Sequence, residues 1–177
     1  MRSIIFLSLI LLSFSSCKSS KRTKYKKTSS TEITSKKSKK GDIEKTKFSI
    51  PKVEHIIDYA KQFEGVRYKW GGTTKSGMDC SGLIYESFRV HDVSLPRISR
   101  DMAKRGEKIV LKNVTKGDLL FFKTGNRRNS INHVGLIISI KNNNIEFIHA
   151  TSGKGVITSW LNETYWLKAF TEARRIL

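Results

Sequence analysis

The chain has 177 residues, enough for one ordinary domain, and it carries 34 Lys/Arg against 15 Asp/Glu, a formal net charge of +19. Its two cysteines are too few for a disulfide-stapled mini-domain. The charge excess does not indicate a nucleic-acid-binding domain, because residues 18–47 hold 12 of the cations against 3 acids and contain almost no apolar side chains.

The N-terminus has the pattern of an export signal. A cation precedes an apolar stretch over residues 4–12 that is too short to span a bilayer, and small residues follow it up to Cys17. A cysteine placed after small residues resembles the lipobox of bacterial lipoproteins, with Phe14 in place of the usual Leu. This resemblance implies a signal peptide over residues 1–16 and a lipid attached to Cys17. The alternative is ordinary cleavage that leaves Cys17 as a free thiol.

Residues 17–50 are predicted to form a lipid-anchored, basic and flexible linker. Its Ser, Thr and Lys side chains cannot bury enough surface to fold, and as a random coil it would span roughly 30 Å. Its charge favours anionic lipid head groups and wall polymers as partners, and no nucleic acid is expected. Lys18, rather than an Asp, follows the anchor cysteine. Under the rule familiar from enteric bacteria, this favours the outer membrane, facing the periplasm.

The folded domain is predicted to span residues 51–177 and to begin with helices. Apolar residues at helical spacing over 53–63 predict a first helix, which Gly65 stops. A second helix is predicted over about 79–90. A short third helix is predicted to start at Ser99, a good N-cap residue.

The second half of the domain is predicted to be an antiparallel sheet. Short apolar runs bounded by turn residues predict strands over 118–122, 133–140, 145–150, 155–160 and 173–177. Residues 141–144 supply the turn between the second and third of these strands. Helices followed by strands indicate an α+β domain.

Cys80 is the candidate nucleophile. Asp79 is a natural N-cap, which places Cys80 in the first turn of a helix, where free N–H groups and the positive end of the helix dipole favour a thiolate. The small residues Ser81 and Gly82 would let a substrate backbone approach. A buried and inert cysteine fits the same pattern, so the assignment depends on a base elsewhere in the chain.

Two histidines can supply that base and a group to orient it. His133 opens one predicted strand and His149 lies near the end of the next. A turn centred on Lys141 places these histidines directly opposite each other on one face, with Cβ atoms about 4.5–5.5 Å apart, close enough for the imidazoles to hydrogen-bond. His55 and His91 have no such partner and are expected to be ordinary polar residues.

A zinc site is the alternative for the same three side chains. Cys80, His133 and His149 could supply three ligands. Metal sites in small domains usually contain close pairs such as Cys-x-x-Cys, and the sequence has none. We therefore expect neither a metal nor an organic cofactor.

Motifs along most of residues 54–177 follow one another in an order that resembles the NlpC-type peptidoglycan endopeptidases. The segments that carry the resemblance are residues 68–72, 78–83, 95–97, 116–122, 133–135, 147–150, 155–157, 165–166 and 173–175. The resemblance implies a papain-like α+β fold in which N-terminal helices pack on an antiparallel β-sheet.

The resemblance also implies roles for individual residues. Cys80 would attack the scissile carbonyl, His133 would act as general base and acid, and His149 would orient His133. Tyr68 would bind the oxyanion or the substrate.

Two further residues, Asp79 and Ser81, would line the groove and engage the free amine of a stem peptide. Three tryptophans, Trp70, Trp160 and Trp166, could stack on sugar rings, although core packing is expected for at least two of them.

The sequence therefore predicts a monomeric, cofactor-free cysteine endopeptidase that hydrolyses an amide in peptidoglycan through a thioester on Cys80. Two bonds fit: γ-D-glutamyl–diaminopimelate within a stem peptide and D-alanyl–diaminopimelate in a cross-link. Two rival functions are an acyltransferase on a related fold and a non-catalytic lipoprotein that binds peptidoglycan.

Overall fold

The computed structural model describes residues 51–125 and 129–177. The predicted signal peptide, the lipidation site at Cys17 and the linker up to residue 50 lie outside the described residues. Within the described ranges, no helix combines the length and apolar character needed to cross a bilayer.

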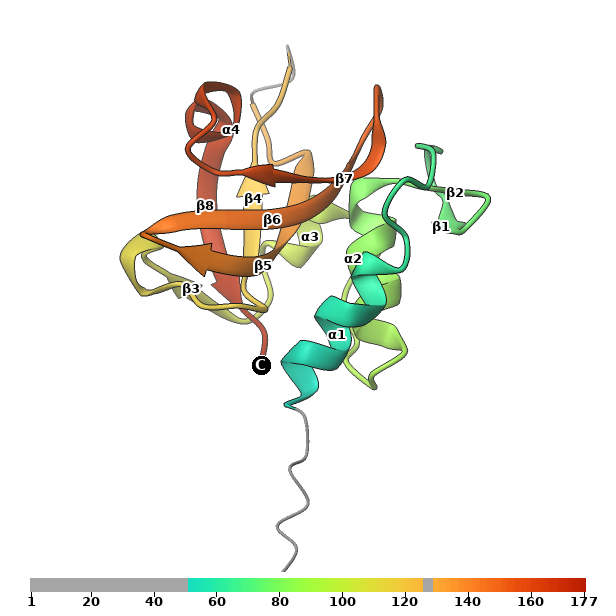
Figure 1. Ribbon diagram of the computed structural model, residues 1–177, viewed down its shortest axis with the longest axis horizontal. Coiled ribbons are helices and arrows are strands. Elements are labelled where there is room, and N and C mark those ends of the chain that lie inside the picture. The colour runs from blue at the N-terminus through green and yellow to red at the C-terminus, as the bar shows by residue number, and fades with distance from the viewer. Residues whose placement is uncertain (1–50, 126–128) are drawn as a thin grey trace, which may run out of the picture. The chain divides into compact units, whose positions relative to one another are not determined.

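A six-stranded antiparallel sheet is the framework of the domain (Figure 1). Its order is β3-β8-β4-β5-β6-β7, so the C-terminal strand lies inside the sheet. The strands are β3 (Glu107–Ile109), β4 (Leu119–Phe122), β5 (His133–Lys141), β6 (Asn144–Thr151), β7 (Gly155–Trp160) and β8 (Phe170–Arg175).

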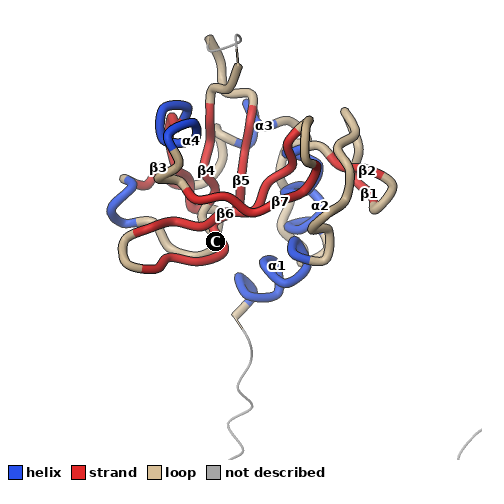
Figure 2. The backbone as a smooth tube through the Cα atoms, turned by 45° about the horizontal axis from the view of Figure 1, so that its top comes forward, coloured by secondary structure: helices blue, strands red, loops and turns tan. Residues whose placement is uncertain are grey.

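Within residues 51–125 and 129–177, three α-helices precede the six-stranded sheet in sequence, and a fourth lies between β7 and β8. The helices are α1 (Lys52–Lys61), α2 (Cys80–Arg89), α3 (Ser99–Met102) and α4 (Thr164–Ala169), with a 3₁₀ turn η1 (Leu111–Asn113). A small hairpin of β1 (Thr73–Thr74) and β2 (Gly77–Met78) precedes α2. Helix α2 packs against α1 and against β5 and β6, as Figures 1 and 2 show.

Both faces of the sheet are buried. Along β4, Leu119 and Phe121 join the core cluster beneath α1 and α2, whereas Leu120 and Phe122 join a second cluster on the other face, around Trp166 of α4. All four β4 residues are fully buried, which explains why this strand is apolar throughout. The antiparallel sheet with helices on it confirms the predicted α+β class.

The predicted helices are confirmed, and α2 begins as expected. The Asp79 side chain caps it by accepting a hydrogen bond of 2.6 Å from the Gly82 N–H. Ser99 is the first residue of α3 rather than its N-cap, which is Ile98. The last strand begins at Phe170, three residues before its predicted start. The hairpin β1–β2, β3 and α4 were not predicted, because each is two to six residues long and its residues show no clear helical or strand periodicity.

The turn between β5 and β6 is tighter than predicted. Asn142 and Asn143 alone form it, with φ values of 49° and 61°. Positive φ at both central residues is typical of the type I′ turn, which Asn tolerates well. Lys141 and Asn144 therefore already pair with each other.

The predicted register of this hairpin is wrong. A bulge in β5 shifts the pairing, and Leu136 lies opposite Ile148. Continued along the strands, this register places Thr151, not His149, opposite His133. The two histidines are therefore diagonal neighbours, and they still share one face of the sheet.

Candidate active site

One cleft of about 550 Å³ brings together the predicted catalytic cysteine and histidine. Its lining includes Cys80 at the start of α2, His133 at the start of β5 and Tyr68 from the loop before β1. His149 is fully buried behind His133 and does not line the cleft. The predicted constellation therefore assembles around one space that a substrate can enter.

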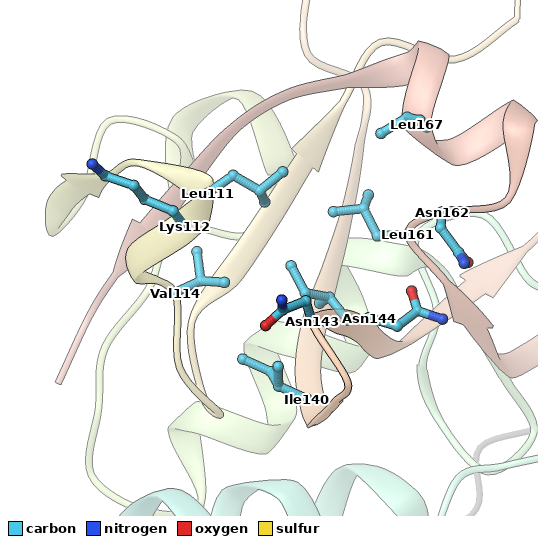
Figure 3. A pocket seen from close by; sticks show the side chains of 10 residues that line it. Leu111, Lys112, Val114, Ile140, Asn143, Asn144, Leu161, Asn162 and Leu167 are labelled. Carbon is cyan, nitrogen blue, oxygen red and sulfur yellow. The ribbon is translucent and has the colours of Figure 1, made fainter.

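A second hollow, of about 600 Å³, lies over the turn between β5 and β6 and beside α4 (Figure 3). Its described lining consists of aliphatic residues and asparagines with a single charged side chain, Lys112. It contains no nucleophile and no general base among these residues. The slightly smaller cleft around Cys80 contains both the candidate nucleophile and the candidate base.

The Cys80 thiol is buried against the backbone at the beginning of β5. Its Sγ lies 4.0 Å from the Asn132 carbonyl oxygen, to which it donates a weak hydrogen bond. Burial raises the pKa of the thiol to about 11, although N–H groups of Val134 and of the first turn of α2 favour the thiolate. The expectation of a lowered thiol pKa is therefore wrong in direction, because desolvation outweighs the helix terminus.

The two histidines form a hydrogen-bonded pair, as predicted. His133 Nε2 lies 2.9 Å from His149 Nδ1, and the rings are nearly perpendicular. On the far side of the pair, His149 Nε2 lies 3.0 Å from Ser159 Oγ. Burial lowers the pKa of His133 to about 4, and burial together with the charge of His133 lowers the pKa of His149 to about 2. Both imidazoles are neutral in the free protein at pH 7.

Trp166 of α4 encloses this pair. Its indole stacks on the His133 ring, with centroids 5.2 Å apart and planes 22° apart, and it meets the His149 ring edge-on at 4.5 Å. Trp166 is buried, so it packs the site as expected for a core residue. Trp70, also in the cleft lining, is 83% exposed and packs against little of the protein.

Asp79 and Ser81 do not line the cleft. The Arg97 guanidinium donates to both Asp79 carboxylate oxygens at 2.9 and 2.8 Å and to Ser81 Oγ at 2.9 Å. Burial alone would raise the pKa of the Asp79 carboxyl, but hydrogen bonds from Arg97 and from backbone N–H groups hold it below its usual value. The Asp79 carboxylate thus has its hydrogen-bonding partners within the protein and serves a structural role. Its charged partner is Arg97, which the sequence indicated only as part of a motif.

Gly82 lies in close contact with the backbone of another segment of the protein, at Gly72. A Cβ at this position would lie 2.1 Å from the carbonyl oxygen of Gly72. The smallness of Gly82 therefore serves close packing of α2 on the segment after Tyr68, rather than the predicted approach of a substrate. This packing also places Tyr68 at the cleft, where burial, followed by the nearby Cys80 and Asp79, raises the pKa of its phenol.

Asn132 is a further residue of the site, and no sequence pattern predicted it. Its carboxamide accepts from the Thr124 N–H at 2.8 Å and donates to the Thr124 carbonyl at 2.9 Å. These bonds hold the beginning of β5, and with it the carbonyl that faces Cys80. In the described part of the chain, no three His, Cys, Asp or Glu side chains are grouped so as to hold a metal ion.

Comparisons with known proteins agree on one family. The sequence profile of the NlpC/P60 family matches residues 65–175. Murein DD-endopeptidase MepS/Murein LD-carboxypeptidase of Escherichia coli (strain K12) is 40% identical over 123 residues, which cover 69% of this chain and 62% of that protein. The probable endopeptidase NlpC of the same strain is 40% identical over 129 residues, covering 72% and 80%.

A solved structure shares the fold as well. The crystal structure of an NlpC/P60 family protein from Bacillus cereus ATCC 10987 superposes with a TM-score of 0.64 at 30% identity, over 71% of this chain and 40% of that one. The match to MepS thus spans a little under two thirds of that relative's length.

The burial of two neutral histidines predicts a pH-dependent stability. In the unfolded chain both titrate near pH 6.5, whereas the folded protein keeps His133 neutral down to about pH 4. The unfolded state therefore binds more protons in this interval, and the free energy of unfolding should fall as the pH is lowered through it. The slope should reach about 1.4 kcal/mol per pH unit for each histidine.

Denaturant titrations at several pH values between 7 and 4 measure this slope. His149→Phe should flatten it, because the variant removes one of the two buried titratable rings. A free energy of unfolding that does not change between pH 7 and 4 would contradict the neutral pair.

Proposed function

The chain belongs to the NlpC/P60 family, and from this premise we propose that it is a cysteine endopeptidase that hydrolyses amide bonds in peptidoglycan. The observation that carries the proposal is the cleft that joins Cys80 to a hydrogen-bonded histidine pair. The names of the relatives, which are murein and probable endopeptidases, support peptidoglycan as the substrate class.

The proposed reaction starts from a neutral thiol and a neutral imidazole. As Cys80 Sγ bonds to the scissile carbonyl carbon, His133 accepts the thiol proton, so the thiolate forms only in the course of attack. His149 accepts a hydrogen bond from His133 Nε2 and holds the ring while it is charged. The developing oxyanion is stabilised by N–H groups at the start of α2 and by the hydroxyl of Tyr68.

The reaction is completed by a second proton transfer and by water. The tetrahedral intermediate collapses, and His133 returns the proton to the leaving amine, which leaves a thioester on Cys80. A water molecule then attacks the thioester with His133 as the base, and the carboxylic acid is released with the thiol restored. No step requires a metal or an organic cofactor.

Two bonds fit this chemistry equally: γ-D-glutamyl–diaminopimelate and D-alanyl–diaminopimelate. Digestion of purified peptidoglycan, followed by mass identification of the released fragments, distinguishes them. The same digestion tests the rival functions, since an acyltransferase or a non-catalytic peptidoglycan-binding lipoprotein would release no hydrolysed fragments.

Substitutions of the three proposed catalytic residues should lower kcat to different extents. Cys80→Ala should abolish hydrolysis while the melting temperature stays nearly unchanged. His133→Ala should lower kcat by about 10³-fold or more, and His149→Ala by about 10- to 100-fold, because an orienting group is partly replaceable and a base is not. Steady-state assays on soluble muropeptides measure these values, and a greater loss for His149→Ala would exchange the two roles.

Trp70 is proposed to contact the sugar that carries the stem peptide. Its indole is 83% exposed at the cleft that contains Cys80, so burial in the core does not account for it. A flat exposed indole offers a stacking surface to a sugar ring.

Trp70→Ala should therefore raise KM about tenfold for a stem peptide that bears its sugar. The same change should leave KM for the sugar-free peptide, and the melting temperature, within experimental error. Val110→Ala, which alters an exposed apolar residue outside the cleft lining, is the matched control. An equal rise in KM for both substrates would assign Trp70 to the peptide instead.

We further propose that the protein is exported and anchored by a lipid on Cys17, at the outer membrane and facing the periplasm. The linker up to residue 50 would tether the domain, residues 51–177, and let it reach nearby peptidoglycan as a monomer. The support is the sequence pattern around Cys17 together with the wall substrate proposed above.

Metabolic labelling with a fatty-acid analogue tests the anchor. The wild-type protein should carry the label and remain in the membrane fraction, whereas Cys17→Ser should carry none. An unlabelled wild-type protein recovered as a soluble secreted species would exclude the lipid anchor.

A further inference from the structure

Three polar side chains form a diagonal line across three adjacent strands. His133 lies on β5, His149 on β6 and Ser159 on β7, and in the β6–β7 pairing Ser159 is opposite Phe147, two residues from His149. Ser159 is thus diagonal to His149, as His149 is to His133. All three are buried, and consecutive members lie 2.9 and 3.0 Å apart.

The atoms in this line determine which ring nitrogen can act as a base. His133 Nε2 faces His149, so Nδ1 is the nitrogen left to take a proton from Cys80. Nδ1 can accept only if the His133 proton sits on Nε2, from which it is donated to His149 Nδ1. His149 must then carry its own proton on Nε2, which lies 3.0 Å from Ser159 Oγ.

Ser159 supplies the acceptor that this arrangement needs. Its hydroxyl can accept the His149 N–H while its own proton points into the cleft that Ser159 lines. If the serine instead donated to His149, each proton along the line would move to the other nitrogen, and His133 Nδ1 would be blocked. Without any hydroxyl, the His149 N–H would be buried without an acceptor.

We propose that Ser159 is a positioning residue that fixes the tautomer of His149 and thereby keeps His133 Nδ1 free to accept the Cys80 proton. This inference rests on the cysteine-peptidase function proposed above. It adds a residue that neither the sequence motifs nor the predicted constellation includes. Ser159 itself does not contact the reacting atoms.

Ser159→Thr and Ser159→Val form a matched pair, because the two side chains have nearly the same shape and differ by the hydroxyl. Ser159→Val and Ser159→Ala should lower kcat on soluble muropeptides by about 10- to 100-fold, with KM within about threefold of wild type. Ser159→Thr should retain kcat within about threefold. Equal kcat values for the Thr and Val variants would overturn the proposal.

A buried serine elsewhere controls for the loss of a hydroxyl as such. Ser87 of α2 is fully buried and donates to the Leu83 carbonyl at 2.8 Å. Ser87→Ala should leave kcat unchanged even if it lowers the melting temperature. If Ser159→Thr proves unstable, Ser159→Ala compared with wild type and with Ser87→Ala decides the question by the same readout.

Two readouts do not depend on the substrate. The rate at which iodoacetamide alkylates Cys80 at pH 7 should fall in Ser159→Val and not in Ser159→Thr. In the wild-type protein, ¹⁵N chemical shifts should place the His149 proton on Nε2, and a proton on Nδ1 would refute the inference. If the wild type proved inactive on peptidoglycan, the proposed function would fail, while these two measurements would still decide the role of Ser159.

Discussion

The hydrogen bond between the buried imidazoles of His133 and His149 is the interaction on which the rest of the site depends. It requires that both rings lie on one face of the sheet and that both stay neutral in the absence of substrate. The register of β5 and β6 puts both rings on one face, and Trp166 favours their neutral state by packing against both of them. Burial of the rings disfavours the charged form of His133, so at pH 7 this imidazole is neutral. In the proposed mechanism it becomes charged only when it accepts the proton of the Cys80 thiol.

The proposed nucleophile, Cys80, is held by a separate electrostatic arrangement. Asp79 caps α2, and the Arg97 guanidinium neutralises its carboxylate through two hydrogen bonds. This ion pair lies next to the Cys80 thiol, which stays protonated at pH 7. Because Asp79 is saturated by these bonds, it anchors the first turn of the helix. The site therefore combines a charged, rigid support with neutral side chains at Cys80 and His133, and in the proposed mechanism charges separate only during proton transfer.

Two kinds of surface surround the reacting groups. The rear of the cleft is closed by buried groups such as Trp166, whereas Trp70 at its edge is open to solvent. This division matches the proposed reaction, which needs desolvated proton transfer at one end of the cleft and recognition of a large, hydrated polymer at the other. The second hollow over the β5–β6 turn, although slightly larger, carries none of the acid–base groups.

The sequence by itself determined the α+β class and the helix start at Cys80, because both depend on local rules. Asp79 before Cys80 is a helix start. A shared face for His133 and His149 depends on the register, because the pairing of Lys141 with Asn144 alone would put them on opposite faces, and the bulge in β5 returns them to one face. Only the tertiary structure decided the register of that hairpin, since a bulge shifts the pairing without changing the apolar pattern. It also decided the rise in the pKa of Cys80, the Arg97–Asp79 pair and the contact of Ser159 with His149. Desolvation and contacts between distant segments arise from tertiary packing, so local sequence patterns do not predict them.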